Sequence, residues 1–275
     1  MGVLDEKVAI VTGSARGIGR ATAELLAEHG ARVVINDLDV DVAEQTAGEI
    51  EGETVVFGGD LTRDGAPEQL VKAAIDAWGR LDIVVNNAGY TLDAPVHKLS
   101  DDWFQRMLDI HLVVPFRVIR AAAPHLREPA KLERERGEEV FRKIVNVSSV
   151  SGTMGNAGQA NYAAGKAGIV GLTKTLAKEW GQLKVNCNAV AFGYIETRLT
   201  ASKDESNTVE IGGERVQLGI PDQLRGMASI LIPLGRSGTP REAAGGVFFL
   251  CSPWSNYVHG QVLNITGGQF TGMTS

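Results

Sequence analysis

Cysteine is scarce in this sequence, which excludes two kinds of protein. Only Cys187 and Cys251 occur among 275 residues. Two cysteines are too few for a disulfide framework, and neither has a partner at the spacing of metal ligands. We therefore expect two thiols in a protein core, no metal site and a reducing compartment.

Positive charge and long apolar runs are also in short supply. The formal net charge is −6, whereas nucleic-acid and anionic-membrane surfaces need clustered positive charge. No apolar run approaches the roughly 20 residues that span a bilayer. The first residues, MGVLDEKVAIVTG, lack the basic, apolar and small-residue regions of a signal peptide. We expect a cytoplasmic protein without nucleic-acid or membrane partners.

The sequence does contain strand and helix patterns in regular alternation. With 44% hydrophobic residues, the chain is long and apolar enough for one large core, so we expect a single α/β domain over residues 1–275. Alternating strands and helices at this spacing predict βαβ units and a mainly parallel sheet. Strands are expected at 8–11, 32–36, 54–57, 81–85, 144–147 and 262–265, and helices at 20–30, 41–50, 67–78 and 241–250.

A glycine-rich turn follows the first strand and opens the first helix. Glycines at such a turn let the backbone approach a pyrophosphate, and the helix N-terminus offers free N–H groups. The spacing GxxxGxG differs from GxGxxG, but the strand before it and the helix after it favour a dinucleotide site over a purely steric turn. The predicted contacts are Gly13, Arg16, Gly17, Ile18 and Gly19.

An aspartate ends the second strand. Asp37 can accept hydrogen bonds from the adenosine ribose hydroxyls and would repel a 2′-phosphate, which predicts NAD(H) over NADP(H). Arg16 could meet such a phosphate, so NADP(H) is not excluded. Ligands of parallel sheets bind beyond the carboxyl ends of the strands. Asp60, Leu61, Asn86 and Ser149 also follow predicted strands and are expected at that edge.

Three side chains have the chemistry to reduce a carbonyl. Tyr162 and Lys166 are four residues apart and would share one face of a helix. An ammonium within roughly 5 Å would lower the pKa of Tyr162 from about 10 towards neutrality, so that the phenol exchanges a proton. Ser149 would hold the substrate oxygen. A surface Tyr–Lys pair is the alternative.

These motifs together resemble the short-chain dehydrogenase/reductase family. The resemblance lies in TGSARGIG, in NNAG, and in Ser149 thirteen residues before the YxxxK pair, and covers about residues 7–268. It implies a Rossmann-type, doubly wound sheet of seven strands, a nicotinamide cofactor and a homotetramer. It also implies that Tyr162 transfers the proton, that Ser149 orients the carbonyl, and that Lys166 binds the nicotinamide ribose and lowers the pKa of the phenol. Further implied cofactor contacts are Asn87, Ala88, Gly89 and Thr197.

The sequence departs from the family pattern at three places. His111 stands where the family usually has a catalytic Asn; a neutral imidazole could do a similar job and add a pH dependence, or could simply pack the helix. Phe192-Gly193 replaces Pro-Gly, which could reshape the pocket floor. Thr266 replaces an aspartate before the final Gly-Gly, which we expect to affect assembly.

Two likenesses within the family concern the substrate. GTMGNAGQANYAAGKAG and IPLGRSGTPREAAGGVFFLCS resemble 3-oxoacyl-(acyl-carrier-protein) reductases. VINDLD and IHLVVPFRVIRAAAPHL look like NAD-dependent (3R)-hydroxyacyl-CoA dehydrogenases. We expect reduction of a 3-oxoacyl thioester, carried on acyl carrier protein or CoA, to the (3R)-3-hydroxy product. The alternatives are the reverse oxidation of a CoA ester, a secondary-alcohol dehydrogenase for a steroid, polyol or sugar, and a non-catalytic dinucleotide-binding regulator.

Two segments are expected to add to this fold. Residues 127–143, REPAKLERERGEEVFRK, have mixed charges that predict a solvated helical extension; their acidic residues make them an unconvincing docking site for an acidic carrier. Residues 194–226 have weak periodicity and many charges and glycines. We expect them to form a mobile flap over the substrate.

Overall fold

Seven parallel strands form the central sheet of the protein. The computed structural model describes residues 2–201, 208–211, 214–219, 226 and 230–269. The strand order is β3-β2-β1-β4-β5-β6-β9, and every pairing in this sheet is parallel. The predicted Rossmann-type fold is therefore confirmed. The strands are β1 (Val8–Thr12), β2 (Arg32–Asp37), β3 (Thr54–Gly58), β4 (Ile83–Asn86), β5 (Arg142–Ser149), β6 (Val185–Phe192) and β9 (Val262–Ile265).

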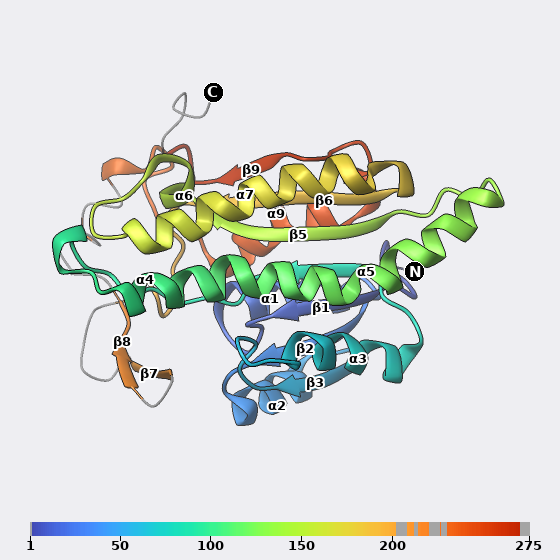
Figure 1. Ribbon diagram of the computed structural model, residues 1–275, viewed down its shortest axis with the longest axis horizontal. Coiled ribbons are helices and arrows are strands. Elements are labelled where there is room, and N and C mark those ends of the chain that lie inside the picture. The colour runs from blue at the N-terminus through green and yellow to red at the C-terminus, as the bar shows by residue number, and fades with distance from the viewer. Residues whose placement is uncertain (1, 202–207, 212–213, 220–225, 227–229, 270–275) are drawn as a thin grey trace.

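Helices cover both faces of the sheet. Side chains alternate between the faces along β1, since Ala9 and Val11 join one apolar core while Val8 and Ile10 join the other. Residues of α1, α2 and α9 line the first core, and those of α3, α5 and α7 line the second, with α5 and α7 in front in Figure 1. Burial on both faces explains why these strands are continuous apolar runs. The helices are α1 (Gly17–Glu28), α2 (Val40–Glu49), α3 (Ala66–Trp78), α4 (Asp101–Leu108), α5 (Val114–Glu135), α6 (Val150–Met154), α7 (Ala160–Trp180) and α9 (Pro240–Cys251).

Shorter elements connect these layers. A π-helical turn, η2 (Asp109–Val113), joins α4 to α5. Antiparallel strands β7 (Thr208–Ile211) and β8 (Glu214–Gln217) form a separate hairpin. This hairpin lies within the predicted flap, residues 194–226; much of that segment lies outside the described residues, and the flap stays a prediction. The 3₁₀ turns are η1 (Val96–Lys98), η3 (Gly181–Leu183) and η4 (Pro253–Ser255).

The charged insertion at 127–143 is helical at its start but not solvated at its end. Helix α5 continues to Glu135, as predicted. Arg142 and Lys143, however, are the first residues of β5 and only 4% and 3% exposed. The prediction of a solvated segment is wrong for these two residues, because each has a polar partner inside the fold: the Glu133 carboxylate for Arg142 and the Asn256 side chain for Lys143.

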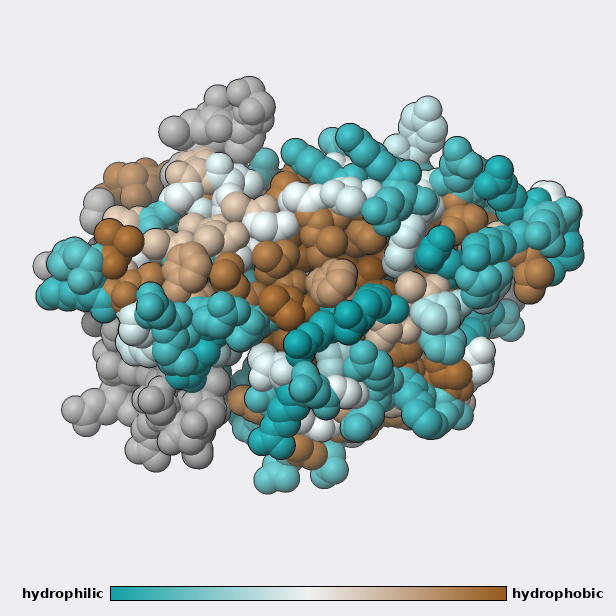
Figure 2. All heavy atoms as spheres, viewed as in Figure 1, coloured by the Kyte–Doolittle hydropathy of each residue, from teal (hydrophilic) through white to brown (hydrophobic). Residues whose placement is uncertain are grey.

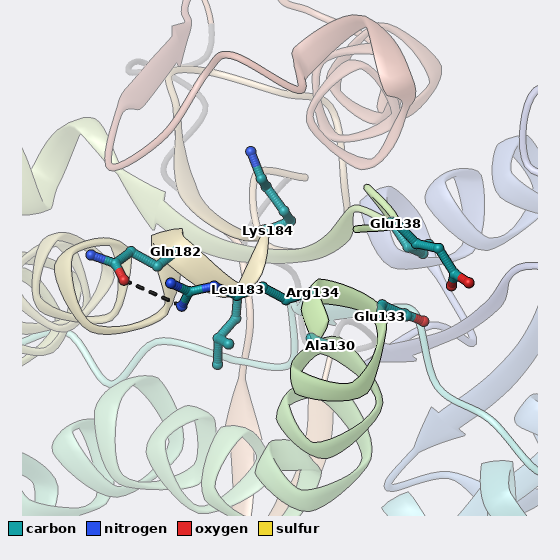
Figure 3. Close-up of a pocket in the computed structure, with 8 residues that line it drawn as sticks. Ala130, Glu133, Arg134, Glu138, Gln182, Leu183 and Lys184 are labelled. Carbon is teal, nitrogen blue, oxygen red and sulfur yellow. Dashed lines mark hydrogen bonds between the residues drawn. The ribbon is translucent and has the colours of Figure 1, made fainter. Parts of the chain in front are cut away.

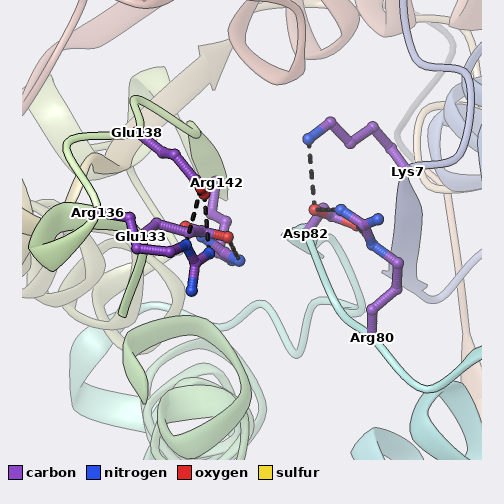
Figure 4. A network of polar contacts seen from close by, with 7 residues as sticks. All are labelled: Lys7, Arg80, Asp82, Glu133, Arg136, Glu138 and Arg142. Atoms are coloured by element: carbon purple, nitrogen blue, oxygen red, sulfur yellow. Dashed lines mark hydrogen bonds and ion pairs between the residues drawn. The ribbon is translucent and has the colours of Figure 1, made fainter. Parts of the chain in front are cut away.

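Ion pairs gather where β4 and β5 begin, at the edge opposite the carboxyl ends of the strands (Figure 4). The buried Asp82 carboxylate accepts hydrogen bonds from the Val8 N–H at 3.0 Å and from the Arg80 guanidinium at 2.8 Å. Because these donors stabilise its charge, the pKa of Asp82 is lowered despite burial. This cluster fixes the start of β4 against β1.

The sequence predicts no disulfide framework, no metal site and no membrane span, and the described residues bear on each of these. Cys187 and Cys251 are free thiols in the core, and burial raises the pKa of each to about 12. Among the described residues, His, Cys, Asp and Glu side chains form no cluster that could hold a metal ion. Nor does any helix in the described ranges have the length and apolar character required to cross a membrane.

Candidate active site

The glycine turn between β1 and α1 is built for close backbone approach. Gly13 and Gly17 have φ of +63° and +57°, the left-handed region that favours glycine. A Cβ on Gly13 would lie 2.7 Å from the Ala88 Cα, and one on Gly19 would lie 2.1 Å from the Gly13 oxygen. In the described residues no side chain caps the N-terminus of α1, and its first turn has no acid. The turn therefore fits a pyrophosphate.

The NNAG segment supports this turn from the neighbouring strand. The Asn87 side-chain amide donates to the Thr12 and Gly13 carbonyls at 2.9 and 3.0 Å. The Thr12 hydroxyl in turn accepts from the backbone N–H groups of Asn87 and Ala88, both at 3.0 Å. Asn87 and Ala88 thus hold the glycine turn in place through hydrogen bonds.

Charged residues surround the end of β2. The Asp37 carboxylate accepts from the Ala15 N–H at 3.1 Å, which places it beside the glycine turn. Arg16 pairs with Asp39 at 2.9 Å and lowers the pKa of that carboxyl. Burial, and then the charge of Arg16, lower the pKa of Arg198. Arg16, the residue that could have met a 2′-phosphate, is thus already paired with a carboxylate.

The remaining predicted cofactor residues lie around the same edge. Thr197 lies across from the glycine turn, with its methyl group 3.5 Å from where a Cβ on Gly17 would be. The Asp60 carboxylate accepts from the Thr62 N–H and hydroxyl at 2.9 and 2.7 Å, while Leu61 is buried. Ile18 packs against the core beneath α1. This arrangement fits a dinucleotide lying along the carboxyl ends of the strands.

Ser149, Tyr162 and Lys166 come together at this edge. Ser149 is the last residue of β5 and caps α6, where its hydroxyl accepts from the Ser151 N–H at 3.1 Å. It is also a hydrogen-bond partner of the Tyr162 phenol. Lys166 lies one turn further along α7, with its Nζ 5.7 Å from the centre of the Tyr162 ring. The structure thus places the three side chains next to one another.

The pKa values of this group differ from the expectation. Burial raises the pKa of Tyr162 to about 12, although the hydrogen bond from Ser149 acts in the opposite direction. Burial also lowers the pKa of Lys166 to about 7, and its Nζ donates to the Val147 carbonyl at 2.7 Å. The predicted lowering of the phenol pKa is therefore wrong for the protein by itself, since desolvation of the buried phenol is the largest effect on it.

His111 joins these three residues from the π-helical turn. It is 2% exposed, and its ring meets that of Tyr162 edge to face with centroids 4.9 Å apart. Gly89, the glycine of NNAG, lies against the same imidazole. All four predicted catalytic residues are thus neighbours.

Two residues that the sequence-based prediction missed order the surroundings of Tyr162. The fully buried Asn161 donates to the Leu92 and Trp103 carbonyls at 2.9 and 3.2 Å and accepts from the Tyr162 N–H at 2.8 Å. Gln159 accepts from the Ser151 hydroxyl at 2.9 Å and donates to the Asp93 carboxylate at 3.0 Å. The negative charge of Asp93 contributes to the raised pKa of Tyr162. No periodic pattern marks these residues, because most of their partners, Leu92, Asp93 and Trp103, are distant in the sequence.

The departures from the family pattern at positions 192–193 and 266 meet in space. A Cβ on Gly193 would lie 3.0 Å from the Thr266 Cα, and the Gly193 N–H donates to the Ile265 carbonyl at 3.0 Å. Glycine at 193 is thus required by the close approach of the segment after β9.

A second hollow lies far from these residues, at the end of α5 (Figure 3). Its charged walls are paired with one another or with neighbours: Arg134 donates to Gln182 at 3.4 Å, and Lys184 pairs with Glu139 at 2.6 Å. Its described lining residues include no combination of Ser, Tyr and Lys like that of Ser149, Tyr162 and Lys166. Its lining residues are Ala130, Glu133, Arg134, Glu138, Val140, Gln182, Leu183 and Lys184.

Comparisons with known proteins agree with this arrangement. Residues 13–269 match the family model described as "Enoyl-(Acyl carrier protein) reductase". The 3-oxoacyl-(acyl-carrier-protein) reductase of Thermotoga maritima is 36% identical, covering 96% of this chain and 98% of the relative. The enzyme of the same name from Vibrio cholerae is 38% identical, covering 97% and 98%. An uncharacterized oxidoreductase of Mycobacterium tuberculosis is 36% identical, covering 98% of each.

Proposed function

The chain belongs to the short-chain dehydrogenase/reductase family and uses a nicotinamide dinucleotide; from this premise we propose that it reduces 3-oxoacyl thioesters to (3R)-3-hydroxyacyl thioesters. One observation carries the proposal: Ser149, Tyr162 and Lys166 lie at the same sheet edge as a glycine turn that fits a pyrophosphate. The names of the similar proteins support an acyl thioester as the substrate.

The side chains divide the chemistry of carbonyl reduction between them. The dinucleotide supplies the hydride. Tyr162 gives its proton to the carbonyl oxygen, and Ser149 donates a hydrogen bond to the same oxygen as negative charge develops there. Lys166 would hold the nicotinamide ribose of the bound cofactor and pass a proton to the phenol.

The electrostatics of the site favour reduction over oxidation. A phenol with a pKa of about 12 is protonated at neutral pH and is ready to give a proton. Oxidation of an alcohol would begin with the phenolate instead, which burial and the Asp93 charge both disfavour. The names of the similar proteins, 3-oxoacyl-(acyl-carrier-protein) reductases, are the reason for preferring a reductase over a (3R)-hydroxyacyl-CoA dehydrogenase, and the protonated phenol suits that direction.

NAD(H) is the proposed cofactor. Asp37 would accept hydrogen bonds from the adenosine ribose and repel a 2′-phosphate. The ion pair between Arg16 and Asp39 supports this preference, because the Arg16 guanidinium is already paired with a carboxylate instead of being available to a 2′-phosphate. NADP(H) binding would require the pair to open.

The proposed assembly is a homotetramer located in the cytoplasm. Figure 2 shows apolar side chains gathered at the centre of the face that α5 and α7 cover. Phe116 on α5 is 44% exposed, and Ala167 and Gly171 on α7 are small and exposed, so a second copy could approach closely. The two free, buried thiols fit a reducing compartment.

Steady-state assays test the proposed reaction. The wild-type protein is expected to reduce acetoacetyl-CoA with NADH. Tyr162→Phe should lower turnover by about 10²–10⁴-fold while dinucleotide binding stays nearly unchanged. Tyr257→Phe is the control, because Tyr257 is fully exposed.

Two outcomes would contradict the proposal. Unchanged turnover in Tyr162→Phe would refute the role of the phenol. Oxidation of a steroid, polyol or sugar by the wild type, without turnover of acetoacetyl-CoA, would point to a secondary-alcohol dehydrogenase instead.

A further inference from the structure

Hydrogen bonds join the loop after β4 to the loop before α7. The Ala94 N–H donates to the Gly158 carbonyl at 2.9 Å, and the Gln159 side-chain amide donates to the Asp93 carboxylate at 3.0 Å. The bond from the Asn161 side chain to the same loop, described above, is the third contact. The loop after β4 is therefore held against the first turn of α7, the helix that carries the reactive phenol.

The side-chain amide of Gln159 is oriented by its other partners. Its Oε1 accepts from the Ser151 hydroxyl at 2.9 Å and from the Asn156 side-chain amide at 3.0 Å. Its Nε2 is thus the atom that faces Asp93, whose ionised carboxylate only accepts hydrogen bonds. The Ser149 hydroxyl in turn accepts from the Ser151 N–H at 3.1 Å. Ser151 and Gln159 therefore link Asp93 to the serine that is expected to hold the substrate oxygen.

The Asp93 side chain is exposed, yet its charge acts on the phenol. Burial is the largest influence that raises the pKa of Tyr162, and the negative charge of Asp93 adds to it, against the hydrogen bond from Ser149. The Lys166 amine donates instead to a backbone carbonyl of β5. Burial, and then the charge of Lys166, lower the pKa of His111 well below 6.5, so the imidazole is neutral. The exposed approach to the phenol therefore carries a negative charge.

This charge distinguishes two forms of a 3-oxo substrate. In a free 3-oxo acid the carboxylate is two bonds from the reacting carbonyl carbon. A carbonyl oxygen that meets Tyr162 therefore keeps the substrate carboxylate within a few ångströms of the phenol, where the charge of Asp93 acts. Like charges repel in such a partly desolvated place, whereas a thioester is uncharged at the same position. Repulsion of the wrong ligand is a common source of specificity.

We propose that Asp93 is a specificity-determining residue that admits uncharged 3-oxoacyl thioesters and rejects free 3-oxo acids, and that Gln159 holds its carboxylate in place. The inference rests on the proposed function, because it names the form of the 3-oxo substrate that the same site takes. Because the effect is a repulsion between partly exposed charges, it should weaken as the salt concentration increases.

Steady-state reduction of a matched pair of substrates measures this selectivity. The pair is acetoacetate and the uncharged thioester S-acetoacetyl-N-acetylcysteamine, each with NADH. Asp93→Asn removes the charge but keeps an oxygen that accepts from Gln159. The ratio of kcat/KM for the acid to that for the thioester is expected to rise about tenfold or more, and added salt should raise it in the wild type only. Asp76→Asn, at an exposed acid on α3, is the control with the same change in net charge.

A second variant tests the role of Gln159. Gln159→Met has a side chain of similar length without hydrogen-bonding groups, so Asp93 loses the amide that holds it. The selectivity for the thioester should fall, but by less than in Asp93→Asn, and the double variant should be no less selective than Asp93→Asn. Unchanged selectivity in Gln159→Met would contradict the role of Gln159. Thermal unfolding checks that each variant folds.

Ligand binding tests the inference without turnover. Saturation-transfer NMR on the protein with bound NAD⁺ compares acetoacetate with acetoacetamide, a neutral ligand of the same shape. We expect the wild type to bind the acid about tenfold or more weakly than the amide, and the difference to disappear in Asp93→Asn.

Equal binding of the acid and the amide by the wild type would overturn the inference, as would a selectivity that persists in a folded Asp93→Asn protein. If the thioester is not reduced while the difference in binding persists, the proposed function fails and the role of Asp93 stands. If Asp93→Asn does not fold, the comparison of the two ligands on the wild type at low and high salt still decides.

Discussion

At individual residues of this protein, burial affects the pKa more than neighbouring charges do. Burial raises the pKa of Tyr162 to about 12 and lowers the pKa of Lys166 to about 7, so that both groups shift towards their neutral forms. At the other edge of the sheet, Lys143 donates to the Asn186, Ser255 and Asn256 side chains, all neutral acceptors. Burial accordingly lowers the pKa of Lys143 to about 8.

Lys143 should make stability depend on pH. Its pKa falls from 10.5 in the unfolded chain to about 8 in the folded one, so between these values the unfolded state binds more protons and stability rises with pH. Relative to Lys143→Met, the wild type should gain on the order of 1–3 kcal/mol of unfolding free energy as pH increases through this window. Denaturant titrations from pH 7.5 to 9.5 measure this difference.

The control for this prediction is Lys184→Met, which removes a lysine that also lies near the Phe141 ring but is exposed. That variant should follow the wild type. A wild-type curve parallel to that of Lys143→Met would show that Lys143 stays charged. Above pH 9 the buried cysteines act in the opposite direction, and they are present in all three proteins.

Asp37 should set the cofactor preference. In Asp37→Ser the repulsion of a 2′-phosphate is removed, so the ratio of kcat/KM for NADPH to that for NADH is expected to rise about tenfold or more. Steady-state kinetics with both cofactors measure the ratio. Asp41→Ser, at an exposed acid in the first turn of α2, should leave it unchanged. An unaltered ratio in Asp37→Ser would exclude Asp37 as the determinant.

Among the elements, α5 connects the active site to the opposite edge of the sheet. Its N-terminus follows the π-helical turn that carries His111, and its far end carries Glu133. Glu133 and Arg142 form a nearly buried ion pair, with both oxygens accepting from the guanidinium at 2.6 and 2.8 Å. A few residues away, Arg136 and Glu138 form a similar but exposed pair (Figure 4).

These two pairs should differ in their contribution to stability. Glu133→Gln leaves the buried Arg142 without a counter-charge and should lower the unfolding free energy by about 3–5 kcal/mol. Glu138→Gln breaks an exposed pair and should cost less than about 1 kcal/mol. Equal losses in chemical denaturation would mean that burial does not distinguish the pairs.

In the molecule as a whole, the active-site residues and the buried ion pairs lie at opposite edges of the sheet. The site lies at the carboxyl ends of the strands, whereas the ion pairs of Asp82 and Arg142 lie where β4 and β5 begin. The apolar area over α5 and α7 (Figure 2) includes neither the active site nor these ion pairs. It is the proposed contact with a second copy of the chain.

A single charge on this face tests the assembly. A Cβ on Gly171 would have no atom within 4 Å, so Gly171→Glu should leave the monomer fold intact but place a carboxylate in the proposed interface. We expect the tetramer to dissociate to smaller species in light scattering. Gly48→Glu on α2, where a Cβ also has open space, is the control. Tetramers that persist in Gly171→Glu would place the interface elsewhere.

The sequence by itself determined the order of strands and helices, the glycine turn and the candidates Ser149, Tyr162 and Lys166. These follow from local patterns: continuous apolar runs, glycines at positive φ, and spacing along one helix. The tertiary structure alone decided the burial of Arg142 and Lys143, the direction in which the Tyr162 pKa shifts, and the contact of the His111 ring with the Tyr90 carbonyl. Desolvation and hydrogen bonding depend on partners distant in the chain, such as Asn256 for Lys143 and the Tyr90 carbonyl for His111, which no local pattern specifies.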